Sequence, residues 1–193
     1  MQYEILEVTD TFVYGRISIA DTVDIDNACQ RALDKQGTET GEVGEEDQGI
    51  DEQARKSSIT WLRKSKKVRE RVDAFVSEIN DEYFHEDISD LAWEYQVTLY
   101  DDTDDHYDWH QDRYEDDEDD QFHRHLSLSI CLSPSEFYEG AEFFIKDGSE
   151  QNVRVFKMKY GEFIIFPSLK EHKVNALREG SRLSLVVWYG HNL

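Results

Sequence analysis

The sequence predicts a mainly β domain of the α+β class, in which N-terminal helices pack outside one sheet of a jelly-roll core. The main observation is a change in the spacing of apolar residues, from helical before residue 90 to alternating after it. The length of 193 residues, 38% of them hydrophobic and 12% aromatic, suffices for one sizeable core. We therefore expect residues 1–193 to form a single domain, with helical support and variable loops over 1–90 and the β core carrying the site over 91–193.

The chain begins with a pattern of two short strands and a helix. Residues 3–8 (YEILEV) and 11–15 (TFVYG) are rich in β-forming residues and are separated by a Thr-Asp turn. Residues 22–35 carry apolar side chains at helical spacing. We expect this helix to begin at Asp21 or Thr22, because the side chains of both residues are suited to an N-cap.

A second helix is predicted within residues 54–84, where the net charge becomes positive. Its apolar residues follow the spacing of an amphipathic helix: Val68, Val72, Phe75, Val76 and Ile79. The same segment contains a cluster of basic residues: Arg63, Lys64, Lys66, Lys67, Arg69 and Arg71. We interpret this cluster as a solvated face that offsets the neighbouring acidic residues, and a binding patch is the alternative.

From residue 91 onwards, short segments rich in Val, Ile, Phe, Tyr and Trp predict strands. The expected strands are residues 91–100 (LAWEYQVTLY), 125–132 (HLSLSICL), 141–145 (AEFFI), 153–159 (VRVFKMK), 161–167 (GEFIIFP) and 182–189 (RLSLVVWY). Strands without a long helix between them are typical of an antiparallel sandwich or barrel.

The charge of the chain restricts its expected partners and location. Asp and Glu number 43 against 21 Lys and Arg, which gives a formal net charge of -22. Because this field repels phosphate backbones and anionic lipids, we expect neither nucleic acid nor a membrane as partner. Residues 1–10 (MQYEILEVTD) show neither the basic nor the apolar region of a secretory signal, and Cys29 and Cys131 form no CxxC pair. A reducing, cytoplasmic location is therefore expected.

The seven histidines include candidates for a metal site. A histidine lies two residues before an aspartate in three places: His85/Asp87, His106/Asp108 and His110/Asp112. A redox-active ferrous site uses two imidazoles and one carboxylate on one face of an octahedron. A His-x-Asp pair at a strand end offers two of these ligands, because alternate strand residues point to the same side. The spacing alone does not choose among the three pairs.

A third ligand must come from a distant strand, and the candidate is His172, which follows the apolar strand at 161–167. Ten residues later, Arg182 opens another apolar strand. Burying a guanidinium is costly unless it is paired. A carboxylate of a bound ligand would pair with both arms of the guanidinium, and a structural salt bridge is the alternative.

Residues 91–190 contain an ordered set of segments: YQVTLYDDTDDHYDWHQD, RHLSLSICLSPSEFYEGAEFFI, GEFIIFPSLKEHKV and EGSRLSLVVWY. Together these segments resemble the iron(II)/2-oxoglutarate-dependent oxygenases, most of all their prolyl 4-hydroxylase-like branch. The segment RKSSITWL extends the resemblance upstream. Members of this family have a double-stranded β-helix, a jelly-roll variant, which agrees with the alternating pattern.

The resemblance implies that His110, Asp112 and His172 bind the catalytic iron. We prefer His110/Asp112 to His106/Asp108 because His110/Asp112 ends an apolar stretch and has the family's spacing from the preceding strand. The segment before the pair, DDTDDHYD, departs from the Gly-rich loop that is usual in the family, so its turn geometry stays open.

The resemblance also implies a cosubstrate pocket. Arg182 would bind the distal carboxylate of 2-oxoglutarate, and Tyr100 and Ser184 would line the pocket. Tyr107 matches an aromatic residue beside the metal strand, and Trp188 matches a packing residue beneath the site. The implied cofactors are Fe(II), 2-oxoglutarate and O2, with ascorbate as an optional reductant.

The implied reaction is hydroxylation of an aliphatic C–H bond, above all in a peptidyl proline, while 2-oxoglutarate becomes succinate and CO2. Two alternatives stay open: a hydroxylase of a small molecule or free amino acid, and a non-catalytic jelly-roll binding module. Residues 101–120 contain twelve acids and one base, which favours a cationic substrate or else forms a solvated loop. We expect this segment and the Gly-rich acidic residues 36–53 to form a lid over the substrate.

Overall fold

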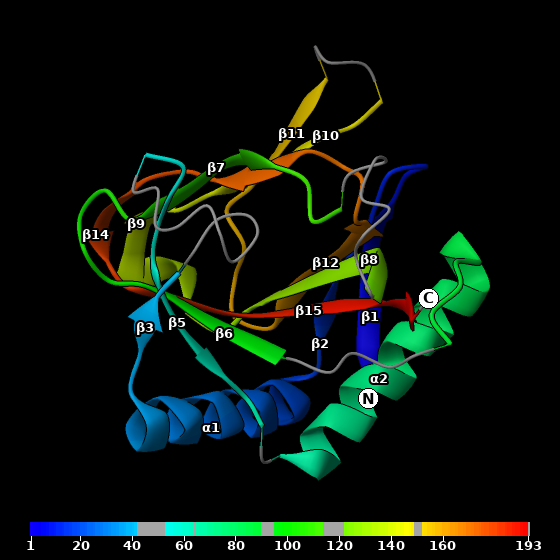
Figure 1. Ribbon diagram of the computed structural model, residues 1–193, viewed down its shortest axis with the longest axis horizontal. Coiled ribbons are helices and arrows are strands. Elements are labelled where there is room, and N and C mark those ends of the chain that lie inside the picture. The colour runs from blue at the N-terminus through cyan, green and yellow to red at the C-terminus, as the bar shows by residue number, and fades with distance from the viewer. Residues whose placement is uncertain (42–52, 64, 90–94, 114–121, 149–151, 193) are drawn as a thin grey trace.

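The computed structural model describes residues 1–41, 53–63, 65–89, 95–113, 122–148 and 152–192. Two antiparallel sheets lie one above the other, and two helices cover the outer side of the larger sheet (Figure 1). This arrangement confirms the predicted jelly-roll core with helices outside one sheet. None of the described helices combines the length and the apolar character that crossing a bilayer demands.

The larger sheet, as described, is eight-stranded, and its central strands come from distant parts of the chain. β15 pairs with β8 on one side and with β6 on the other, so that Ser184 lies opposite both Cys131 and Thr98. In spatial order the strands are β1 (Tyr3–Val8), β2 (Val13–Ile17), β12 (Glu162–Pro167), β8 (Phe122–Cys131), β15 (Arg182–Asn192), β6 (Tyr95–Tyr100), β5 (Ser58–Trp61) and β3 (Glu39–Thr40).

The smaller sheet has five strands among the described residues, and a two-stranded ribbon lies apart from both sheets. The five strands lie in the order β11 (Val153–Phe156), β10 (Phe143–Lys146), β13 (His172–Val174), β7 (His106–His110) and β4 (Arg55–Lys56). The ribbon pairs β9 (Tyr138–Gly140) with β14 (Leu177–Gly180). Within the smaller sheet, β13 pairs with β7 and places His172 directly opposite His110.

The first helix, α1 (Ile19–Gln36), begins earlier than the sequence pattern predicts. Its N-cap is Ser18, whose hydroxyl accepts a hydrogen bond from the backbone N–H of Asp21 at 3.2 Å. The expectation of Asp21 or Thr22 as the cap was therefore wrong. These residues lie in the first turn, where Thr22 donates its hydroxyl to the Ser18 carbonyl at 2.9 Å.

The second helix, α2 (Lys66–Ile79), covers the predicted apolar pattern from Val68 to Ile79, and a π-helical turn, Asn80–Phe84, follows it. Before the helix the chain forms β4 and β5, which the sequence pattern did not predict. Ile59 of β5 lies opposite Thr98 of β6, so pairing with a distant strand decides the structure here. Of the basic cluster, Arg71 forms ion pairs with Asp21 and Asp24 of α1, while Lys64 lies outside the described residues.

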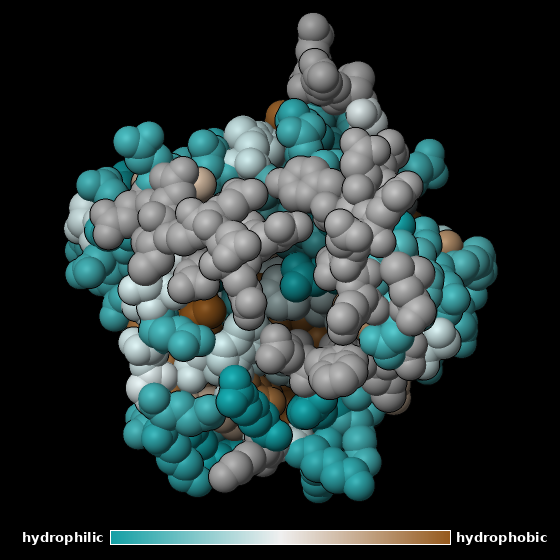
Figure 2. Space-filling view, in the orientation of Figure 1, coloured by the Kyte–Doolittle hydropathy of each residue, from teal (hydrophilic) through white to brown (hydrophobic). Residues whose placement is uncertain are grey.

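Two hydrophobic cores lie on the two sides of the larger sheet. The first joins the helices to the sheet and includes Ile25, Ala28, Val72, Phe75, Ile79, Val97, Leu128, Phe163, Leu185 and Val187. The second lies between the sheets and includes Phe12, Tyr100, Cys131, Tyr138, Phe143, Met158, Ile164, Phe166 and Val174. Hydrophobic residues are visible in a hollow near the centre of the face in Figure 2, and hydrophilic residues cover most of its remaining coloured surface.

The two acidic segments are described only in part. Residues 36–41 end α1 and form β3, whereas 42–52 lie outside the described residues. Residues 101–113 are described and contain β7, whereas 114–120 are not. The turn before β7 is closed by Asp105, whose carboxylate accepts backbone N–H groups of Asp101 and Asp102 at 3.0 and 3.1 Å.

Gly140 has a positive φ of 80°, and a Cβ there would lie 2.2 Å from the Ala176 carbonyl oxygen. Gly148 has nearly the same φ, 79°, but open space around it. Alanine at either position incurs the left-handed backbone cost of about 1–2 kcal/mol. We expect Gly140→Ala to lower the free energy of unfolding by about 2 kcal/mol more than Gly148→Ala, because only Gly140→Ala also forces backbone atoms apart. Urea denaturation measures this difference, and equal losses would contradict the close packing of β9 on β14.

Candidate metal centre and cosubstrate pocket

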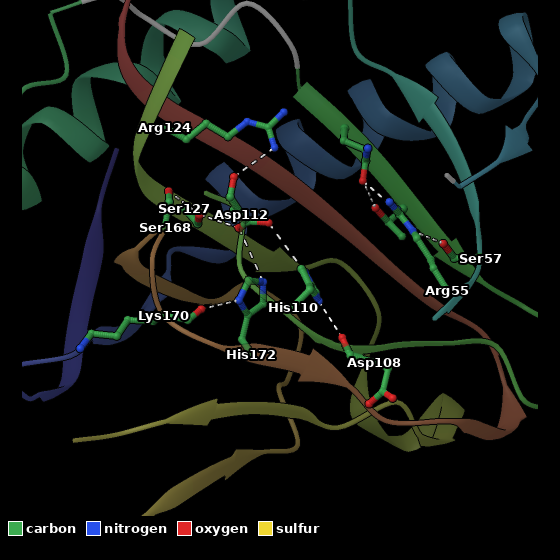
Figure 3. A network of polar contacts seen from close by, with 12 residues as sticks. Arg55, Ser57, Asp108, His110, Asp112, Arg124, Ser127, Ser168, Lys170 and His172 are labelled. Atoms are coloured by element: carbon green, nitrogen blue, oxygen red, sulfur yellow. Dashed lines mark hydrogen bonds and ion pairs between the residues drawn. The ribbon is translucent and has the colours of Figure 1, made fainter. Parts of the chain in front are cut away.

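Three predicted ligands, His110, Asp112 and His172, converge between the two sheets (Figure 3). One donor atom from each lies within 4.8 Å of the others. The Nε2 atom of His110 is 3.7 Å from Oδ1 of Asp112, and Nε2 of His172 is 3.6 Å from Oδ2. The β13–β7 pairing causes this convergence, since it sets the start of one strand beside the end of the other.

Both imidazoles are oriented by backbone carbonyls. Nδ1 of His110 contacts the Asp108 carbonyl at 2.7 Å, and Nδ1 of His172 contacts the Lys170 carbonyl at 2.9 Å. A carbonyl only accepts hydrogen bonds, so each Nδ1 carries the proton and each Nε2 presents a lone pair. Burial, together with the neighbouring His172, lowers the pKa of His110 to about 3. His110 is therefore neutral at physiological pH, which is the form that binds a metal.

The carboxylate of Asp112 is held by two serines. Ser127 donates its hydroxyl to Oδ2 at 2.6 Å, and the Ser127 and Ser168 hydroxyls lie 2.9 Å apart. Burial alone raises the pKa of Asp112, but His172, His110 and the Ser127 hydroxyl together hold it below its ordinary value. Asp112 is thus an anion oriented toward the two imidazoles.

The backbone of Asp112 is also fixed. Its N–H donates to the Ser168 carbonyl at 2.9 Å, and Nη1 of Arg124 donates to its carbonyl at 3.4 Å. The guanidinium of Arg124 also lies 4.4 Å from the centre of the Trp188 ring. Trp188 therefore packs next to the residues that support Asp112.

Two imidazoles and one carboxylate are the donor set that suits Fe(II) with open coordination positions. The competing histidine, His106, is partly buried and uses both ring nitrogens in contacts with the carbonyls of Asp104, at 2.7 Å, and Gln53, at 3.0 Å. Within the described ranges, His110, Asp112 and His172 are the group of donors spaced for a metal ion. The donors present therefore fit an iron ion.

Aromatic rings pack against both histidines. The Tyr107 ring stacks on His110 with ring centroids 3.4 Å apart, and the Arg55 guanidinium lies 4.6 Å from the Tyr107 ring centre. The strand register explains the contact between Arg55 and Tyr107, because Arg55 of β4 lies opposite Tyr107 of β7. On the other side, Phe143 and Phe166 lie 5.6 and 4.6 Å from His172 between ring centroids.

Arg55 is a buried residue of the site that sequence reasoning missed. Its side chain donates to Ser57 Oγ and to Gln96 Oε1, each at 2.9 Å. It stands in a basic, polar stretch, RKSS, whose pattern carries no sign of burial. The resemblance of RKSSITWL to the family was the one available signal. Ser127, Phe143 and Phe166 were likewise read only as strand residues.

Arg182 is buried beside the second hydrophobic core and only 1% exposed. Its guanidinium lies 5.7 Å from the Tyr100 ring centre, and its Nη1 lies 3.5 Å from Ser184 Oγ. Its Nε has no hydrogen-bond partner. Among the described residues no carboxylate forms an ion pair with Arg182, so they do not supply the alternative salt bridge. A buried cation with an unused donor fits the carboxylate of a bound ligand.

Tyr138 belongs to the same hydrophobic core as Tyr100 and was missed by sequence reasoning. Its hydroxyl donates to the Met158 carbonyl at 2.6 Å and lies 3.9 Å from Cys131 Sγ. Burial raises its pKa, so the phenol stays protonated. The core that contains Tyr100 and Tyr138 beside Arg182 also contains Phe143 and Phe166 beside His172. Apolar side chains therefore connect the candidate anion site to the candidate metal site.

Comparisons with known proteins agree with this geometry. The model of the 2OG-Fe(II) oxygenase superfamily matches residues 95–190. A PKHD-type hydroxylase of Prochlorococcus marinus (strain AS9601) is 40% identical over 63 residues, which are 33% of this chain and 28% of that protein. A PKHD-type hydroxylase of Idiomarina loihiensis is 35% identical over 63 residues, which are again 33% of this chain and 28% of that protein. The matched part of the chain thus spans less than a third of the length of these relatives.

Solved structures extend the similarity to nearly the whole chain. A Pseudomonas putida prolyl-4-hydroxylase has a TM-score of 0.74 at 18% identity and covers 94% of this chain and 93% of its own. A prolyl hydroxylase from Trichoplax adhaerens, solved with a peptide fragment of hypoxia inducible factor, has a TM-score of 0.75 at 16% identity, with coverages of 94% and 84%. At such identities the likeness shows a shared fold. With the family match and the donor set, we conclude that the chain belongs to the 2OG-Fe(II) oxygenase superfamily and has a prolyl 4-hydroxylase-like fold.

Proposed function

We propose that this protein is an iron(II)/2-oxoglutarate-dependent oxygenase that hydroxylates an aliphatic C–H bond of a peptidyl proline. The observation that supports it most is the presence of two sites beside one hydrophobic core. Two imidazoles and a carboxylate converge in one of them, and a buried arginine without a carboxylate partner among the described residues forms the other. A dicarboxylic cosubstrate would use both sites at once.

Iron held by His110, Asp112 and His172 would couple the decarboxylation of 2-oxoglutarate, to succinate and CO2, to insertion of one atom of O2 into the substrate C–H bond. The protein's part is to bind and orient. Arg182 would hold the distal carboxylate of 2-oxoglutarate through two parallel hydrogen bonds, with Tyr100 and Ser184 beside it.

The surroundings of the site keep these groups ready before the cosubstrate arrives. The carbonyls at Asp108 and Lys170 orient the two imidazole rings through Nδ1, and Ser127 orients the carboxylate of Asp112. Apolar residues of the inner core limit access of water, which strengthens the attraction between Arg182 and an anion.

A peptide substrate is favoured by the neighbouring structures, one of which was solved with a peptide bound. The excess of acidic residues, with a net charge of -22, favours a cationic peptide. A small-molecule substrate predicts instead that proline-containing peptides are left unchanged. A non-catalytic module predicts that no succinate forms.

Incubation with Fe(II), 2-oxoglutarate, O2 and a library of basic, proline-containing peptides is expected to add one oxygen atom to a peptide and to form succinate. Mass spectrometry detects both products. His110→Ala is expected to reduce both by at least about 100-fold, because it removes a ligand that the iron needs. His106→Ala is the matched control, since it removes a partly buried imidazole of the same strand. Loss of activity in the control, with activity kept in His110→Ala, would show that the ligands are assigned wrongly.

Arg182→Gln is expected to raise the dissociation constant of 2-oxoglutarate by about 10- to 100-fold, the usual worth of a charge-assisted pair. Arg182→Lys keeps the charge but lacks the planar guanidinium, so the dissociation constant of 2-oxoglutarate should rise less than in Arg182→Gln. Calorimetric titration of the metal-loaded protein measures both constants. An unchanged constant in Arg182→Gln would reject this residue as the anchor of the distal carboxylate.

Ser127→Ala is expected to weaken iron binding by about 10- to 100-fold, because it removes the donor that orients Asp112. Ser129→Ala is the matched control on the same strand, since Ser129 is also buried. Iron affinity is measured by competition with a chelator. Equal affinities of the two variants would mean that the contact between Ser127 and Asp112 does not support the metal.

A further inference from the structure

Two side chains form a stack on the candidate iron ligand His110. The ring of Tyr107 is nearly parallel to the His110 imidazole, with 10° between the ring planes and 3.4 Å between the ring centroids. The guanidinium carbon of Arg55 lies 4.6 Å from the centre of the Tyr107 ring. Such a short distance places a guanidinium over a ring face, where the cation attracts the π electrons. Tyr107 is therefore packed between the imidazole and the guanidinium.

Strand pairing brings Arg55 and Tyr107 together. β4 pairs with β7 so that Arg55 lies directly opposite Tyr107. Beside this pair, the N–H of Asp108 donates to the carbonyl of Ala54 at 2.8 Å. Side chains that lie opposite each other in an antiparallel ladder are in contact on one face of the sheet. The cation and the ring therefore meet because of the backbone register.

Buried polar side chains fix the guanidinium of Arg55 by hydrogen bonds. Its Nε donates to Ser57 Oγ at 2.9 Å (Figure 3), and its Nη2 donates to Gln96 Oε1 at 2.9 Å. The same Gln96 oxygen accepts the hydroxyl of Thr98 at 3.1 Å. Arg55 is only 5% exposed, and hydrogen bonds in such a buried network strengthen one another.

The neighbouring backbone leaves the guanidinium little room. A Cβ on Gly41 would lie 2.6 Å from Nε of Arg55 and 2.7 Å from Ser57 Oγ. The N–H of Gly41 donates to the Ser57 carbonyl at 2.8 Å, which keeps this backbone in place. Arg55 is thus a rigid support for the Tyr107 ring.

The orientation of His110 depends on this support. Its Nδ1 contacts the Asp108 carbonyl at 2.7 Å, and this hydrogen bond fixes one atom of the ring. A tilt of the ring about that contact would turn Nε2 away from Asp112, whose Oδ1 lies 3.7 Å from it. A flat ring stacked on the imidazole opposes the tilt. Tyr107 therefore helps to set the direction in which Nε2 points.

We propose that Arg55 and Tyr107 are positioning residues for the iron ligand His110. Arg55 holds the Tyr107 ring against the imidazole, and the stack keeps Nε2 directed at the metal position before the metal binds. This inference rests on the proposed function, since it takes His110 as a metal ligand. Both residues act through His110 and donate no atom to the iron.

The same network connects the two candidate sites. Gln96 and Thr98, which hold Arg55, share the inner face of β6 with Tyr100, because alternate residues of a strand point to the same side. The ring of Tyr100 lies beside Arg182, with 5.7 Å between the ring centre and the guanidinium carbon. One strand therefore supports both the iron ligand and the candidate anion site.

Titration of the metal-free protein with Co(II) tests the proposal, because the visible absorption of bound Co(II) changes with its coordination geometry. Arg55→Met and Tyr107→Leu are each expected to raise the dissociation constant of Co(II) about 10-fold and to alter this absorption, since His110 is then less well directed. Arg55→Lys keeps a cation and Tyr107→Phe keeps the ring, so both should restore most of the affinity. Arg55→Met also removes two buried hydrogen bonds, whereas Tyr107→Leu tests the stack at a half-buried position.

The matched control is Arg154→Met, which should bind Co(II) as the wild type does. Arg154 belongs to the same sheet and also lies over aromatic rings, those of Phe12 and Phe156, at 5.5 and 5.9 Å. The double variant Arg55→Met/Tyr107→Leu should lose about 10-fold in affinity, because Arg55 acts through Tyr107, whereas independent effects would give about 100-fold.

The outcomes separate the positioning role from the metal centre itself. A wild type that binds Co(II), together with unchanged affinity and absorption in Tyr107→Leu, would reject the positioning role and leave the proposed function standing. Additive losses in the double variant would also reject it, because Arg55 would then act without Tyr107. A wild type that binds no Co(II) would reject the metal centre, and the proposed function and this inference with it.

Discussion

The antiparallel pairing of β13 with β7 is the interaction on which the candidate site depends. It sets His172 opposite His110, and it directs the end of β7 so that Asp112 comes to lie between their Nε2 atoms. Strand pairing is rigid, because backbone hydrogen bonds fix the register and a slip of one residue would turn each side chain to the other face. Ligands that are distant in sequence are thereby held at metal-binding distances in the protein alone.

The site also concentrates charge in an apolar interior. The side chains of Asp112 and Arg182 are almost fully buried. Among the described residues, no Lys or Arg forms an ion pair with Asp112, and no Asp or Glu forms one with Arg182. Burying such groups is costly, and the cost is offset only when opposite charge is supplied. A cation at the histidines and a dicarboxylate at Arg182 would each relieve it. We therefore expect bound ligands to stabilise the inner core, in line with the membership of the chain in the 2OG-Fe(II) oxygenase superfamily.

The larger sheet serves different purposes on its two faces. Its inner face holds Ser127, Ser184 and Arg182 for the candidate site, while its outer face packs on α1 and α2. At one end of the sheet, the register shift beside Gly190 lets β8 and β15 bring three histidines into contact. Alternation along one strand can thus contribute residues to the site and to the helical layer at the same time.

Some features were predictable because they depend on local patterns. Alternation of apolar residues predicted β6, β8, β10, β11, β12 and β15, and the ordered motifs pointed to His110, Asp112, His172 and Arg182 as candidates. The ribbon strands β9 and β14 are too short to show a period, and the short strands β4 and β5 were not predicted either. Ser18 was missed as a cap because its role depends on the N–H of Asp21 in the folded chain.

The sequence by itself determined the fold class and the residue types available for a metal and an anion, because periodicity and motif order are properties of neighbouring residues. Only the tertiary structure decided which of these residues meet. It stacked Tyr107 on His110 and Arg55 on Tyr107, placed Ser127 on Asp112, left Arg182 without a described carboxylate partner and gathered His123, His125 and His191. The physical reason is that such contacts depend on strand register and packing between distant segments, which no local pattern contains.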